Sequence, residues 1–128
     1  MTSIEVPYSI AAALPTLSVM DITNDVSKSV AKSGCREGIA YIHAVPCSSV
    51  VRIQERETGI FEDLELMFER LVPGGTPARE LILSTLMGPR TEAVPVSEGR
   101  MGLGTYQRIL LFSLDADCRP EWSLTILG

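Results

Sequence analysis

The stretch VPCSSVVRIQE, residues 45–55, places a thiol, two hydroxyls, a guanidinium and an amide in one short segment. Cys47 could act as a nucleophile if a base lay within hydrogen-bond reach. The one histidine, His43, is the only such base nearby, and Pro46 between them leaves their relative orientation open. Ser48 has no evident activating base. We therefore interpret Cys47 as a small semi-buried thiol and Ser48 as a strand-start hydroxyl bonded to the backbone, and keep both as weak catalytic candidates.

Side chains alternate along an extended segment, so the same stretch divides into two faces. One face carries Ser48, Arg52 and Gln54, and the other carries Ser49, Val51 and Ile53. Arg52 offers a planar fork of donors that suits phosphate, so the first face could cradle an anion. Arg79, at the start of a predicted helix, is a second anion-binding candidate. For either arginine taken alone, an exposed surface charge is the simpler interpretation.

The sequence offers little for a metal or a cofactor. A transition-metal site needs three or four converging ligands, and the chain has one histidine and three widely spaced cysteines, at positions 35, 47 and 118. We expect neither a metal nor a cofactor. His43 lies within an apolar run, so we interpret it as a core or interface histidine bonded to a backbone partner. Cysteines without a CxxC motif are typical of free thiols in a reducing cytoplasm.

Length and composition indicate a single globular domain over residues 1–128, with 45% hydrophobic and 21% charged residues. The formal net charge of −5 argues against a nucleic-acid partner. No basic amphipathic segment or long apolar run points to a membrane. The apolar stretch at 9–14 has no basic residue before it, so a signal peptide is not expected and the predicted location is the cytoplasm.

Periodicity and turn residues predict the elements that must position these side chains. Helices are expected at residues 21–34, 58–75 and 76–88, and strands at 4–10, 16–20, 38–45, 48–54, 91–96, 100–114 and 122–128. This order favours an α+β fold in which about three helices pack on antiparallel sheets.

Several elements carry more specific expectations. The nearly continuous apolar run at 38–45 predicts a strand buried on both faces. Thr76 and Pro77 predict the cap and first position of the third helix. Gly102 and Gly104 predict a bulge or a close backbone approach within the strand at 100–114. In the second helix, the expected core stripe is Ile60, Leu64, Met67, Phe68 and Leu71, and the expected solvated face is Glu62, Asp63, Glu65 and Glu69.

Three motifs together resemble a known family. They are DITNDV at 21–26, LVP with STLMGP between 71 and 89, and PVSEGRMGLGTYQRILL at 95–111. The last is similar to the P-V-x-x-G-x-x-x-x-G-T-W-Q-x-I signature of the YjbQ-like family, also labelled secondary thiamine-phosphate synthase. The resemblance implies a compact, β-sandwich-like α+β fold and a homotrimer with clefts between subunits. It also implies a phosphate-bearing or anionic ligand and, in some members, weak thiamine-phosphate synthase activity.

The resemblance breaks at the catalytic residues. The family strand motif is His-Thr-Thr/Ser-Ala-x-Leu-x-x-Asn-Glu. Pro46 stands at its histidine, and Cys47 and Ser48 stand at its hydroxyl positions. Gln54 replaces the asparagine, and Glu55 matches.

The other family positions are matched in part. Leu81 stands at a helix histidine, and a histidine-rich stretch before that helix is shortened to PGGTPARELI. Asp63 matches an acidic position and becomes a third weak catalytic candidate. Thr105 and Gln107 match outright, and Tyr106 replaces the tryptophan. Thr105 and Gln107 could orient a polar ligand, or be polar groups satisfied at a subunit interface.

The histidines lost here are the family's acid–base groups near neutral pH. We therefore expect a divergent homotrimer that binds a phosphorylated or anionic small molecule and has weak or no thiamine-phosphate-synthase-type activity. The alternative is a catalytically silent structural or partner-binding trimer without a small ligand. The expected ligand-binding residues are Ser48, Arg52, Gln54, Glu55, Thr105 and Gln107.

Overall fold

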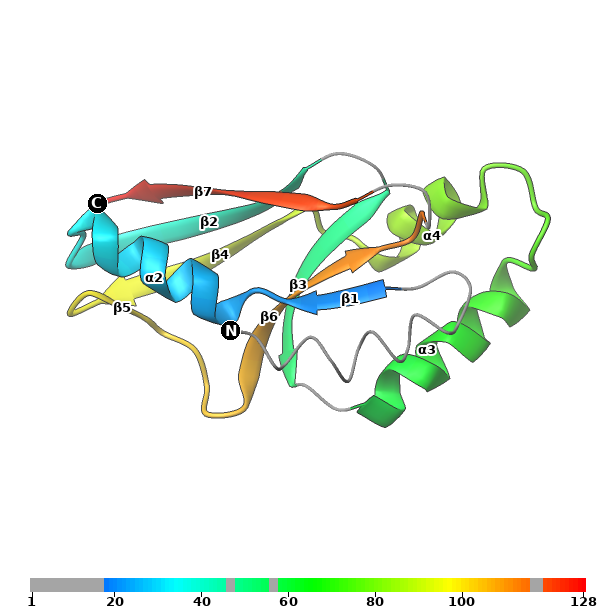
Figure 1. The fold of residues 1–128 in the computed structure, drawn as a ribbon, viewed down its shortest axis with the longest axis horizontal. Coiled ribbons are helices and arrows are strands. Elements are labelled where there is room, and N and C mark those ends of the chain that lie inside the picture. Colours follow the sequence, from blue (N-terminus) through cyan, green and yellow to red (C-terminus); the bar gives the residue numbers. More distant parts are fainter. Residues whose placement is uncertain (1–17, 46–47, 56–57, 116–118) are drawn as a thin grey trace.

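The computed structural model describes residues 18–45, 48–55, 58–115 and 119–128 (Figure 1). The predicted strand at 4–10, Cys47 and Cys118 lie outside these residues. The described elements follow the chain as β1 (Ser18–Asp21), α2 (Thr23–Ser33), β2 (Glu37–Val45), β3 (Ser49–Glu55), α3 (Thr58–Leu71), α4 (Arg79–Met87), β4 (Thr91–Ser97), β5 (Arg100–Met101), β6 (Gln107–Ser113) and β7 (Glu121–Leu127).

The strands form two antiparallel sheets, which confirms the predicted α+β class. A three-stranded sheet has the order β1-β6-β3, and a four-stranded sheet has the order β5-β4-β2-β7. Figure 1 shows α2 beside the four-stranded sheet at one end of the molecule and α3 and α4 at the other end. None of the described helices is long and apolar enough to cross a membrane.

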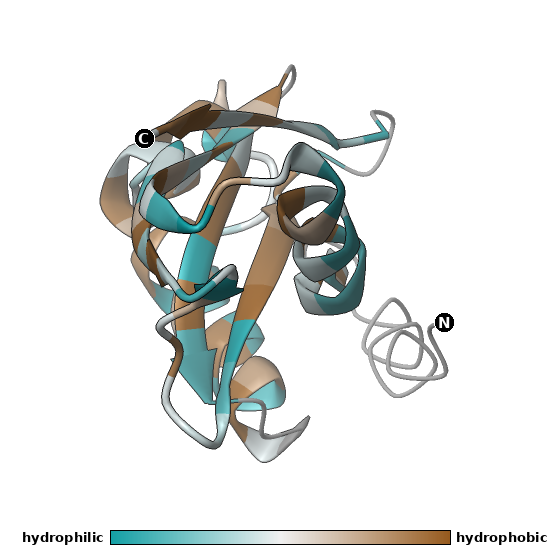
Figure 2. Ribbon diagram, turned by 90° about the vertical axis from the view of Figure 1, so that its left-hand side faces the viewer, coloured by the Kyte–Doolittle hydropathy of each residue, from teal (hydrophilic) through white to brown (hydrophobic). Residues whose placement is uncertain are grey.

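The three-stranded sheet is buried on both faces, because alternate residues of each strand enter different cores. On one face, Val51 and Leu111 pack with α2 and the inner face of the four-stranded sheet. On the other face, Val50 and Phe112 pack with α3 and α4. The rings of Phe61 and Phe112 meet there, with centroids 5.9 Å apart. Figure 2 shows hydrophobic residues along the long strands at the centre of the molecule.

Helix α2 lies within the range predicted for it, residues 21–34. The side chain of Asp21 accepts a hydrogen bond from the Thr23 N–H at 3.0 Å, so it supplies a partner for the start of the helix. Gly34 ends the helix in the left-handed conformation, with a φ of 75°.

Strand β2 is buried on one face only, so the prediction of burial on both faces is wrong for the single chain. Ala40, Ile42 and Ala44 face the core. Ile39 and His43 lie on the outer face of the four-stranded sheet, and both are exposed. The physical reason is that the helices and the second sheet cover just the inner face.

Helix α3 turns a different side to the core from the one its periodicity predicts. Phe61 and Phe68 are buried, whereas Ile60, Met67 and Leu71 of the predicted stripe are 45%, 50% and 62% exposed. The helix is apolar on two neighbouring sides, and the pattern alone does not decide which side packs. The predicted solvated face is correct for its other members but wrong for Glu65, which is buried.

Helix α4 begins two residues later than predicted, with Ala78 and not Thr76 at the cap position. Arg79 is its first residue, and Ala78 before it has a φ of 55°. Thr76 does not cap the helix, because its hydroxyl donates instead to the Pro73 carbonyl at 2.7 Å. The predicted cap is therefore a residue of the preceding turn.

The predicted strand at 100–114 is two strands in different sheets. Arg100–Met101 forms β5 of the four-stranded sheet, and Gln107–Ser113 forms β6 of the three-stranded sheet. Gly102 and Gly104 lie in the crossing between the sheets, so they form no bulge within one strand. The predicted close approach is confirmed at Gly102, where a Cβ would lie 3.3 Å from the Pro95 side chain and the N–H donates to the Pro95 carbonyl at 2.8 Å. Between the strands predicted at 91–96 and 100–114, Glu98 and Gly99 form the turn before β5, with φ values of 54° and 80°.

Candidate ligand site

Arg52 lies on the face of β3 that looks toward α3 and α4, and it is half-buried. One amino group of its guanidinium, Nη1, donates to the carbonyls of Met87 and Gly88 at 2.8 and 3.1 Å. These carbonyls end α4, where a positive charge is favourable. The bonds fix the guanidinium in place. Its Nε–H and second amino group make no hydrogen bond to any described residue.

Gln54 lies two residues along β3 and therefore on the same face as Arg52. It is half-buried, and Arg108 of β6 is its partner in the strand register. Its side-chain amide makes no hydrogen bond within the described part of the chain. Arg52 and Gln54 thus present unpaired polar groups to the space between β3 and the helices α3 and α4.

A groove of about 340 Å³ occupies that space, between β3 and the two helices. This volume is near the lower end for small-molecule sites, which combine mostly apolar walls with a few polar groups. Arg52 and Gln54 are its polar residues. The apolar residues are Leu64, Met67, Phe68, Leu71, Leu86 and Met87. Part of the stripe that the sequence assigns to the core therefore lines a groove. The sequence shows that this side of α3 is apolar. Only the packing of α3 beside α4 shows that it lines a groove.

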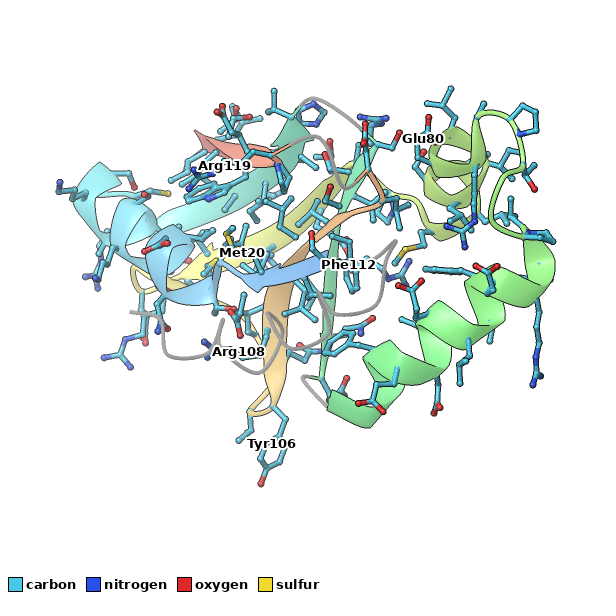
Figure 3. The ribbon with its side chains drawn as sticks, turned by 45° about the vertical axis from the view of Figure 1, so that its right-hand side comes forward. Met20, Glu80, Tyr106, Arg108, Phe112 and Arg119 are labelled. Atoms are coloured by element: carbon cyan, nitrogen blue, oxygen red, sulfur yellow. The ribbon has the colours of Figure 1, made fainter. Side chains whose placement is uncertain are left out.

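Glu55, Thr105 and Gln107 gather at one end of the three-stranded sheet. Glu55 and Gln107 are register partners, on the opposite face of the sheet from Arg52. The Gln107 side-chain oxygen accepts the Gly104 N–H at 2.7 Å and so closes the turn before β6. Tyr106 is 78% exposed in that turn, and Figure 3 shows its ring extending away from the molecule.

Ser48 lies at the other end of β3. It is buried, and its carbonyl accepts the Leu114 N–H at 3.0 Å. Strand β3 rises about 3.3 Å per residue, so roughly 20 Å separate Ser48 from Glu55. The structure brings Arg52 and Gln54 together, and it places Ser48 apart from Thr105 within one chain.

The catalytic candidates do not assemble into a described site. Cys47 is outside the described residues, Ser48 is buried, and Asp63 is exposed on α3. His43 is exposed on the outer face of the four-stranded sheet, with Nδ1 2.7 Å from the Thr91 hydroxyl oxygen. The predicted backbone partner and the predicted core position are therefore wrong for the single chain, and the alternative position at a subunit interface stays a prediction. Among the described residues, no three His, Cys, Asp or Glu side chains cluster as metal ligands would.

Arg79 is neither an exposed charge nor an open anion site. It is buried, and its Nε donates to the Val72 carbonyl. One of its amino groups lies 3.3 Å from a Glu69 carboxylate oxygen. These bonds join the end of α3 to the start of α4, so Arg79 supports one wall of the groove.

The chain matches a family model described as UPF0047 protein YjbQ-like over residues 13–128. A UPF0047 protein from Archaeoglobus fulgidus is 32% identical over 108 residues, which cover 77% of this chain and 82% of that protein. Another from Methanothermobacter thermautotrophicus is 32% identical over 121 residues, covering 88% and 84%. The crystal structure of a hypothetical protein from Aeropyrum pernix has 26% identity and a TM-score of 0.77, covering 88% of this chain and 90% of that one.

Proposed function

Because the chain belongs to the YjbQ-like family, UPF0047, we propose that it is a divergent homotrimer that binds an anionic or phosphate-bearing small molecule. We further propose that its thiamine-phosphate-synthase-type activity is weak or absent. The names of the matched relatives specify no activity. The proposal therefore rests on the residues of this chain.

The observation that carries the ligand proposal is the pair Arg52 and Gln54. A guanidinium held by the end of α4 keeps three N–H donors unpaired within the described residues, and an unpaired amide lies beside it. Arg52 is also the one charged side chain among the described residues that line the groove. Such a site favours an anion, because charge-assisted hydrogen bonds are stronger than neutral ones.

The position of His43 supports weak or absent catalysis. Histidine is the side chain best suited to acid–base chemistry near neutral pH. The single histidine faces outward from the four-stranded sheet, while Arg52 faces α3 and α4 from the three-stranded sheet. Both sheets therefore separate His43 from the groove of the same chain.

The outer face of the four-stranded sheet supports self-association, with other copies of the chain as its partners. Ala93, Tyr41 and Thr125 form one row across β4, β2 and β7. The neighbouring rows also lack Asp, Glu, Lys and Arg, and they consist of Pro95, Ile39 and Leu127, and of Thr91, His43 and Ser123. Ile39 and Leu127 of this face are 41% and 59% exposed in the single chain, and a subunit contact would remove their apolar surface from water. We therefore assign this face to the subunit contact.

The ligand cleft is proposed to be completed by a neighbouring subunit. The rim of the groove carries Leu71 and Leu86, which are exposed in the single chain. A neighbouring subunit placed over this rim would remove apolar surface from water and close the open side of the groove.

The purified protein is expected to form thiamine phosphate at least about 100-fold more slowly than a family member with the histidines, since acid–base groups contribute about 10²- to 10⁴-fold. The measurement follows product formation from the pyrimidine diphosphate and the thiazole phosphate. Circular dichroism of the same sample shows that a low rate does not come from unfolding. Equal rates would contradict the proposed loss of activity.

A further inference from the structure

We propose that the anion bound at Arg52 and Gln54 is amphipathic, with one carboxylate or phosphate head on an apolar body. This inference rests on the proposed function, because it names the ligand class of the same groove. It goes further in excluding strongly hydrophilic ligands such as sugar phosphates.

The walls of the groove determine the body of the ligand. Leu64, Met67 and Phe68 line it from α3, and Leu86 and Met87 line it from α4. Hydroxyl groups of a sugar would lose water against these side chains without gaining hydrogen bonds. An aliphatic chain or an aromatic ring would instead bury its own apolar surface.

The polar end of the groove determines the head of the ligand. Arg52 supplies one positive charge, and two of its five N–H donors are already committed to the end of α4. That helix end carries a partial negative charge, so each further negative charge on the ligand is unfavourable. One carboxylate or one phosphate monoester suits this balance better than a diphosphate.

Calorimetric titration of the full chain tests the ligand class with butanoate, hexanoate and octanoate. Each methylene that enters the groove is expected to raise the affinity about fourfold at most, since burying a methylene is worth about 0.8 kcal/mol. Octyl phosphate is expected to compete with octanoate. Octanol is expected to bind at least about tenfold more weakly, because it lacks the charge-assisted hydrogen bonds. Affinities that do not rise from butanoate to octanoate would overturn the inference.

Two matched variants on α4 test whether the apolar body of the ligand lies in the groove. Leu86 and Ile82 are 61% and 40% exposed, but only Leu86 is among the lining residues of the groove. Leu86→Asn is expected to weaken octanoate binding about tenfold, and Ile82→Asn is expected to leave it unchanged. Equal effects of the two substitutions would overturn the inference.

The binding experiments distinguish failure of the amphipathic ligand from failure of the anion site itself. Binding of a phosphate monoester at Arg52 without any gain from chain length would overturn the amphipathic ligand and leave the anion site standing. Failure of every anion to bind would overturn both and would favour a trimer without a small ligand.

Discussion

Replacement of Asp21 by alanine is expected to lower the free energy of unfolding by about 3 kcal/mol, since removing one partner of a buried ion pair is strongly destabilising. Asp21 is buried and accepts hydrogen bonds from the Thr23 N–H at 3.0 Å and the Thr23 hydroxyl at 2.7 Å. It also pairs with the Arg108 Nε at 2.8 Å. The Thr23 hydroxyl in turn accepts the Ile109 N–H at 2.7 Å. One carboxylate therefore joins β1 and α2 to the centre of β6.

Urea unfolding followed by circular dichroism, at one fixed protein concentration, measures this effect. Asp25→Ala is the matched control, because Asp25 is exposed in the first turn of the same helix. It is expected to change the free energy of unfolding by no more than about 0.5 kcal/mol. Equal stability losses for Asp21→Ala and Asp25→Ala would show that the buried network is not what holds α2 to the sheet.

Substitution of Ala93 by glutamate is expected to convert the proposed trimer to monomers. Ala93 is exposed beside Tyr41, in the middle of the uncharged outer face of the four-stranded sheet. Burying an unpaired carboxylate in a subunit contact costs several kcal/mol per copy. The single chain loses no packed side chain, so its own fold should persist.

Light scattering measures the mass, and circular dichroism checks the fold of each variant. Wild type and the control Ala31→Glu, which changes an exposed residue of α2, are expected at three times the 13.9 kDa chain mass. Ala93→Glu is expected at the mass of one chain. A trimeric Ala93→Glu would move the subunit contact to another surface, and a monomeric wild type would refute the trimer itself.

Local patterns were sufficient for several parts of the fold. The Asp21 side chain and Gly34 define the ends of α2 through bonds and dihedral angles within a few residues. Alternation along β3 correctly predicts that Arg52 and Gln54 share a face. In each case the controlling interactions are close in the sequence.

Features that depend on distant partners were not predictable in this way. Helix α3 is apolar on two sides, and contact with the sheet decides that Phe61 faces inward while Met67 lines the groove. Nothing local indicates that Arg79 is buried by its bond to Val72. The split between β5 and β6 depends on the pairing of each with a different sheet.

For the candidate site, too, local patterns predict some features, whereas others depend on residues that are distant in the sequence. Residue alternation places Ser48 on the face of Arg52, but the rise of about 3.3 Å per residue puts them about 13 Å apart along the strand, and Ser48 lies at the far end. The family resemblance implies ligand-binding roles for Thr105 and Gln107. In the structure, however, the Gln107 side-chain oxygen accepts a hydrogen bond that closes a turn. The walls of the groove come from two helices that meet only in the folded chain.

The most direct test of an anion site at Arg52 and Gln54 is a nuclear magnetic resonance titration with phenyl phosphate. We expect saturable shifts of the Arg52 Nε–H and Gln54 side-chain amide signals. The Arg108 Nε–H, which donates to Asp21, is an internal control and is expected to stay unchanged. Unchanged Arg52 and Gln54 signals, or equal shifts of Arg52 and Arg108, would show that no anion site exists at these residues.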